Sequence, residues 1–112
     1  MIGLDTNVLV RYLTQDDPKQ SKQATHLIEA VLTSAAPGFV SLVVLMELYW
    51  VLTRLYRVTY DEWLALQDDL LNGAHFLVQH REVVQATAQV CKLKRAGFID
   101  ALIAQVDRKS VV

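Results

Sequence analysis

The sequence contains one cysteine and no long hydrophobic run, and each absence excludes a class of protein. Cys91 has no partner for an internal disulfide, so we expect a reducing compartment and a buried, inert thiol. The most apolar stretch, 42–52, contains Glu47 and is far shorter than the ~20 residues of a membrane-spanning helix. The N-terminus lacks a basic segment and carries Asp5 and Asn7, unlike a signal peptide. We therefore expect a cytoplasmic protein.

The chain also lacks a predominant charge. Its 11 Lys and Arg residues oppose 12 Asp and Glu residues, for a net charge of −1. Such a protein does not coat duplex nucleic acid, so any contact with nucleic acid must come from local clusters of basic residues. With 112 residues, 53% of them hydrophobic, and no internal repeat or linker, residues 1–112 are expected to form a single domain with its own core.

Several catalytic motifs are missing as well. The sequence has no Gly-rich phosphate loop, no G-x-S-x-G motif and no Cys–His pair, so nucleotide switching and covalent hydrolysis have no support. His26, His75 and His80 do not have the spacing of zinc ligands, and we expect them at exposed or capping positions.

Short apolar runs alternate with longer amphipathic segments, which predicts an α/β fold with a mainly parallel sheet and helices on both faces. Thr6 or Asn7 is expected to cap the first helix, Ser41 the third, and Thr59 with Glu62 has the spacing of a capping box. We expect strands at residues 2–4, 39–41 and 75–78, helices at about 8–15, 18–33, 42–56, 60–72, 80–95 and 98–107, and the opening of a further strand at 110–112.

Three acidic residues stand near predicted strand ends or helix starts, where such sheets place their sites. Each has a structural interpretation beside the functional one. Asp5 follows the first strand and is either a capping or a catalytic carboxylate. Glu47 lies in an apolar run and either faces solvent or is compensated by a cation. Asp100 lies in the first turn of the last helix, where the helix dipole also favours an acid.

Taken together, the three acids indicate a divalent metal site. Neighbouring carboxylates stay ionised only if a cation lies between them, and an oxygen-only ligand set selects Mg²⁺ or Mn²⁺ over zinc. Such ions can activate a water molecule and stabilise the leaving oxygen of a phosphodiester.

Three segments resemble the acidic motifs of PIN domains, in order and with similar spacing. They are 1–7 (MIGLDTN, with the D-[TS]-N pattern), 41–48 (SLVVLMEL) and 98–104 (FIDALIA). The resemblance covers the whole chain and is greatest to VapC toxins of bacterial toxin–antitoxin pairs. It implies a three-layer α/β/α fold, Mg²⁺- or Mn²⁺-dependent endoribonuclease activity on RNA, a homodimer, and inhibition by a VapB-type antitoxin.

Carried over to this sequence, the resemblance makes Asp5 and Asp100 the principal metal ligands and the catalytic residues. Glu47 would complete the site directly or through a metal-bound water, and Thr6 or Asn7 would support Asp5 by hydrogen bonding.

The sequence departs from the family at its C-terminal end. Family members continue into a further strand, a Thr-x-Asp motif and a last helix, which are missing after Val112, and many carry an acid where this chain has Gly97. Asp107 lies about 10 Å along the helix from Asp100, too far to take the place of the missing fourth acid. A second metal site is therefore in doubt.

Other residues near the predicted site have two interpretations each. Basic residues around Asp100 either position phosphates or are ordinary solvated charges, and three aromatic residues and one leucine of the third helix form either core or a protein interface. The basic residues are Lys92, Lys94, Arg95, Arg108 and Lys109. The residues of the third helix are Tyr49, Trp50, Leu52 and Tyr56.

The main alternative to an active ribonuclease is a catalytically silent PIN module that dimerises and binds an antitoxin. A phosphate-transferring hydrolase with Asp5 as nucleophile is disfavoured, since its D-x-D pattern needs an acid in place of Asn7. A receiver domain is disfavoured because it needs an acidic pair near the end of the first strand.

Overall fold

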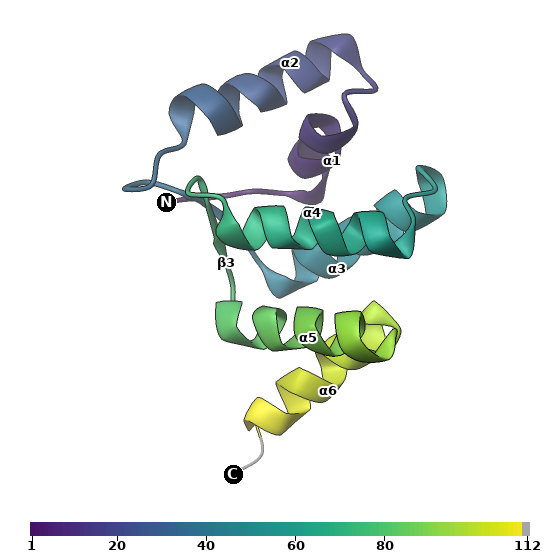
Figure 1. Cartoon of the computed structure of the whole chain (residues 1–112). Coiled ribbons are helices and arrows are strands. Elements are labelled where there is room, and N and C mark those ends of the chain that lie inside the picture. The colour runs from purple at the N-terminus through teal and green to yellow at the C-terminus, as the bar shows by residue number, and fades with distance from the viewer. Residues whose placement is uncertain (111–112) are drawn as a thin grey trace.

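The computed structural model describes residues 1–110, with side chains as far as residue 108 (Figure 1). Its three strands are parallel and lie in the order β1 (Ile2–Gly3), β2 (Gly38–Val40) and β3 (Phe76–Val78). In the register, Ile2 pairs with Gly38, and Gly38 pairs with Phe76. The prediction of an α/β fold with a parallel sheet is confirmed.

The helices connect the strands and dominate the molecule. Figure 1 shows α1 and α2 at the top, α5 and α6 at the bottom, and α3 and α4 between them. Among the described residues, no helix is long and apolar enough to cross a membrane. The helices are α1 (Thr6–Thr14), α2 (Pro18–His26) with its π-helical continuation η1 (Leu27–Val31), α3 (Leu42–Leu55), α4 (Tyr60–Asn72), α5 (Arg81–Lys94) and α6 (Phe98–Ser110).

Two of the expected boundaries were wrong. Asp5, and not Thr6 or Asn7, caps α1, because its backbone is extended and its carboxylate accepts a hydrogen bond from the Val8 amide at 2.9 Å. Helix α6 continues to Ser110, so this residue does not open a further strand, and 111–112 lie outside the described residues.

The start of α3 is bonded to the end of the sheet. Ser41 accepts a hydrogen bond from the Val44 amide, as predicted, and the Gln79 side chain accepts one from the Leu42 amide at 2.9 Å. Gln79 directly follows β3, and its own amide donates to the Val40 carbonyl. These bonds satisfy amide groups that a helix start leaves without partners, and they fix the direction of the helix that carries Glu47.

Aromatic packing places α6 against α3 and α4. The Phe98 ring centre lies 5.0 Å from that of Tyr49 and 5.1 Å from that of Trp63, and Trp63 and Phe98 are fully buried. The Tyr60 hydroxyl on α4 donates to the Ala96 carbonyl just before α6. Burial raises the pKa of this hydroxyl, so Tyr60 keeps its proton for that bond. These contacts hold the start of α6, and Asp100 lies in its first turn.

The predicted capping box and the predicted burial of Cys91 are both confirmed. Thr59 and Glu62 exchange the two hydrogen bonds that define a capping box at the start of α4. Cys91 is completely buried in α5 and belongs to the core.

Replacing a buried residue of α3 should destabilise the fold far more than replacing an exposed one. Leu48 has no exposed surface, whereas Val43 on the same helix is 65% exposed. We expect Leu48→Ala to lower the free energy of unfolding by about 2–5 kcal/mol, because it removes buried methyl groups and leaves a cavity. Val43→Ala, the matched control, should change it by less than about 0.5 kcal/mol. Urea unfolding followed by circular dichroism measures both, and equal losses would contradict the described orientation of α3.

Candidate active site

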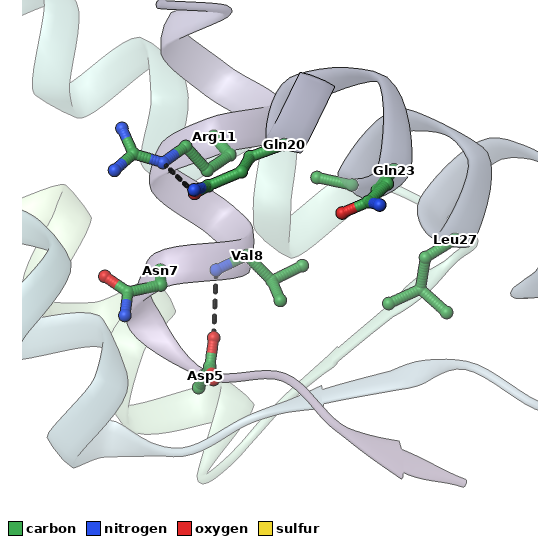
Figure 2. Close-up of a pocket in the computed structure, with 8 residues that line it drawn as sticks. Asp5, Asn7, Val8, Arg11, Gln20, Gln23 and Leu27 are labelled. Carbon is green, nitrogen blue, oxygen red and sulfur yellow. Dashed lines mark hydrogen bonds between the residues drawn. The ribbon is translucent and has the colours of Figure 1, made fainter. Parts of the chain in front are cut away.

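Asp5 lies at a cavity of about 410 Å³ between α1 and α2. Its carboxylate is exposed, and one oxygen is held by the Val8 amide (Figure 2). The cavity is lined by Asp5, Asn7, Val8, Arg11, Gln20, Gln23, Ala24 and Leu27. Asp5 and Asn7 from the first predicted motif therefore share one cavity. The hydrogen bond to Asp5 comes from the backbone amide of Val8 and not from the side chain of Thr6 or Asn7.

A network of hydrogen bonds fixes the guanidinium group of this cavity. Arg11 donates to both oxygens of Asp16, at 2.9 and 3.0 Å, and to the Gln20 side chain at 2.9 Å. The hydroxyl of Tyr56, just after α3, donates to the same Asp16 carboxylate at 2.5 Å. The hydrogen bond from Tyr56, with those from Arg11 and Thr14, lowers the pKa of Asp16 to about 2, and the bond to Asp16 raises the pKa of Arg11. The Arg11 charge is thus compensated at neutral pH.

Asp100 lies at a second cavity of about 430 Å³, between α3 and the start of α6. Trp50 is 42% exposed there, and the Arg54 guanidinium lies 4.0 Å from the centre of its ring. This distance is typical of a cation–π contact. The lining consists of Tyr49, Trp50, Thr53 and Arg54 from α3 and of Gly97, Phe98, Ile99 and Asp100.

Glu47 is exposed on α3 and lines neither cavity. It precedes Trp50 by three residues, so the two side chains are neighbours on the helix surface. Glu47 is therefore on the side of α3 that faces the Asp100 cavity, and its exposure explains how an acid is accommodated in an apolar run.

The described residues contain the right ligand types for a hard cation but not a ready-made site. Carboxylate oxygens suit Mg²⁺ or Mn²⁺, and all three acids are exposed. Within residues 1–110, however, no group of three or more His, Cys, Asp or Glu side chains is close enough to hold a metal ion. The three-acid ligand set remains a prediction.

Two of the basic residues near Asp100 are already paired. Lys92 contacts Asp68 at 2.6 Å, and Arg95 contacts Asp61 at 2.5 Å, so both join α5 to α4. This pairing favours their interpretation as ordinary surface charges over phosphate positioning. Lys94 and Arg108 are exposed, and the side chain of Lys109 is outside the described part.

The other residues with two interpretations divide between core and surface. Leu52 is in the core, Tyr49 and Tyr56 pack against it, and Trp50 is at the surface. The histidines occupy ordinary positions: His26 is exposed at the end of α2, a His75 ring nitrogen lies 2.8 Å from the Leu32 carbonyl, and His80 precedes α5.

Arg11, Gln20, Gln23 and Arg54 line the two cavities, and the sequence-based prediction missed all four. One signal was available, because Gln20, Gln23 and Leu27 recur at the three- and four-residue spacing of one helix face. The pairing of Arg11 with Asp16 depends on the turn between α1 and α2, which spacing alone does not reveal.

The PIN domain family model matches residues 2–108, and the chain therefore belongs to the PIN domain family. No curated protein matches the chain. PIN domains are generally metal-dependent nucleases and often occur in toxin–antitoxin systems. The strand order, the parallel sheet and the helix content agree with the α/β/α fold of this family.

Removing the Tyr56 hydroxyl should raise the pKa of Asp16 in the folded protein. Because that pKa lies below its ordinary value of 3.8, ionised Asp16 stabilises the fold above that pH, and this contribution is lost as the pH falls toward about 2. In Tyr56→Phe the largest cause of the shift is gone, so the pKa should move toward 3.8, and the stabilisation from Asp16 should be smaller and fully lost at a higher pH.

NMR titration of the Asp16 carboxyl carbon measures this change. Tyr12→Phe is the matched control, because the Tyr12 hydroxyl donates to Glu29 and not to Asp16. An Asp16 pKa that is the same in Tyr56→Phe as in the unmodified chain would show that the hydroxyl does not carry the shift.

Proposed function

We propose that this PIN domain is a divalent-metal-dependent endoribonuclease of the VapC type, the toxin component of a type II toxin–antitoxin system. The observation that carries the proposal is the family match over residues 2–108, together with exposed acids in all three matching motifs. Asp5 follows β1 and Asp100 lies in the first turn of α6, positions where a parallel α/β fold exposes chemical groups.

In this proposal Asp5 and Asp100 are the principal ligands of Mg²⁺ or Mn²⁺, and Glu47 completes the site directly or through water. When bound by these residues, such a cation would supply Lewis-acid chemistry for hydrolysis of the phosphodiester, so no side-chain nucleophile would be required. The Val8 amide donates a hydrogen bond to one oxygen of Asp5 and so orients the carboxylate at the start of α1. Thr6 and Asn7, in the first turn of α1, support Asp5.

Because the three acids do not form a ready-made site, the cation and the RNA phosphate would have to draw them together. The side chains of Glu47 and Asp100 are exposed, and no ion pair within the described residues engages either one. We therefore expect weak binding of the metal by the protein alone.

The same proposal includes a cytoplasmic location, a homodimer and a VapB-type antitoxin as partner. The homodimer and the antitoxin are supported by the exposed apolar side chains of α3, where Val43 is 65%, Trp50 42% and Leu55 75% exposed. A contiguous patch of exposed apolar side chains is typical of a protein-binding surface, and Val43 and Trp50, seven residues apart, lie on the same face of α3.

A silent PIN module is the second candidate function. One observation favours it: Asp5 and Asp100 line different cavities, and Asp5 already has a structural role as the cap of α1. Such a module would retain the apolar surface of α3 for dimerisation and antitoxin binding without cleaving RNA.

Removing either principal acid should abolish RNA cleavage. In the presence of Mg²⁺ or Mn²⁺, Asp5→Asn and Asp100→Asn should lower the cleavage rate of single-stranded RNA by at least about 100-fold, since each loses a metal ligand. Asparagine is also a good N-cap, so Asp5→Asn should keep α1 intact. A panel of labelled RNAs, incubated with and without EDTA, measures the rate.

Asp107→Asn is the matched control, because Asp107 is an exposed aspartate of the same helix as Asp100. The Asp107→Asn variant should cleave RNA at the same rate as the unmodified chain. If the well-folded unmodified chain cuts no RNA with either metal, the silent module is the better assignment.

Metal binding can be measured without cleavage. Bound Mn²⁺ broadens nearby NMR signals, so we expect it to broaden the amides of Asp5 and Asp100 together, and both effects to disappear in Asp5→Asn. Broadening at only one of the two residues would contradict a shared cation.

A further inference from the structure

The cavity between α1 and α2 has walls of two kinds. Val8, Ala24 and Leu27 form an apolar wall, and the side chains of Asn7, Gln20 and Gln23 add amide groups. Figure 2 shows Gln20 and Gln23 pointing from α2 toward α1. A flat apolar surface beside a few polar groups is the usual arrangement in pockets for small ring-shaped ligands, and the cavity volume of about 410 Å³ is in their range.

The amide of Gln20 is held in one orientation. Its oxygen accepts the hydrogen bond from the Nε of Arg11, which is itself held by both oxygens of Asp16. The nitrogen of the Gln20 amide therefore remains as a fixed donor at the cavity. A fixed donor can select a ligand by the acceptor that the ligand presents.

Gln23 contributes a second amide, one turn further along α2. Within the described residues its side chain makes no hydrogen bond, and it is exposed. It therefore offers both a donor and an acceptor, the combination with which glutamine side chains contact base edges.

The charges of the cavity disfavour an anionic ligand. The Arg11 guanidinium is compensated by Asp16, and the Asp5 carboxylate lies at the cavity without a basic partner among the described residues. In the absence of a cation a phosphate group would be repelled, whereas a neutral ring with hydrogen-bonding edges would fit both kinds of wall.

We propose that this cavity binds one unpaired nucleobase of the RNA substrate, next to the bond cleaved at Asp5, with Val8 and Leu27 against the ring and Gln20 and Gln23 at its edge. This inference rests on the proposed ribonuclease function and adds a specificity-determining pocket to it. Single-stranded RNA suits such a pocket, since its unstacked bases expose both faces and edges.

Titration with free nucleosides tests the pocket separately from catalysis. The ¹⁵N-labelled chain is titrated with adenosine, guanosine, cytidine and uridine in the presence of EDTA, which removes any contribution from metal or cleavage. We expect at least one nucleoside to shift the amide signals of Val8, Gln23 and Leu27. Gln23→Ala and Gln20→Ala should each weaken that binding by about three- to ten-fold, the effect of one lost hydrogen bond.

The matched control is Gln89→Ala, which removes an exposed glutamine of α5 and should leave the affinity unchanged. In RNA cleavage, Gln23→Ala should raise KM with little change in kcat, because the variant loses a contact to the base and keeps all the proposed metal ligands. It should also relax the preference for the base beside the cleaved bond.

The outcomes distinguish failure of the base-binding pocket from failure of the ribonuclease assignment. If no nucleoside shifts these signals, or if the shifts lie elsewhere, the pocket is disproved even when RNA is cleaved. If nucleosides bind at Val8, Gln23 and Leu27 but the unmodified chain cuts no RNA, the pocket stands and the nuclease assignment fails.

Discussion

The packing of Phe98 between Tyr49 and Trp63 is the contact on which the C-terminal half of the molecule depends. The three rings come from α6, α3 and α4, and their centres lie 5.0 to 5.3 Å apart. Each such pair contributes about 0.5–1.5 kcal/mol beyond the burial of its surface. Because α6 begins at Phe98, this packing also determines where Asp100 enters the surface cavity beside α3.

Helix α3 connects the two candidate cavities. Trp50, on its outer surface, lines the cavity of Asp100, and Tyr56, just after its end, bonds to the Asp16 that orients Arg11 at the cavity of Asp5. The start of α3 is bonded to Gln79 at the end of β3. A shift of this helix would therefore change both cavities.

Electrostatics limit how this protein can hold RNA. The net charge is −1, and Lys92, Arg95 and Arg11 are each paired with an aspartate. Arg54, at the Asp100 cavity, contacts the Trp50 ring and has no ion pair among the described residues. The basic groups near the acids are thus only partly available to phosphates, and the proposed contacts are a cation between carboxylates and neutral contacts to a base. Both are short-range interactions, and they favour an unpaired segment of RNA over a long duplex.

Local patterns in the sequence determined the elements, and the tertiary structure decided how their side chains meet. The strands, the caps at Ser41 and Thr59 and the position of Asp100 in a helix start were predictable, because they depend on residues within one turn or one strand. The choice of Asp5 over Thr6 or Asn7 as the cap of α1 was left open, since neighbouring residues compete for a cap, and the length of α6 was not predictable, since packing against α5 extends a helix. The placing of Asp5 with Gln20 and Gln23, and of Asp100 with Trp50, depends on contacts between segments far apart in the chain, and no local pattern encodes those contacts.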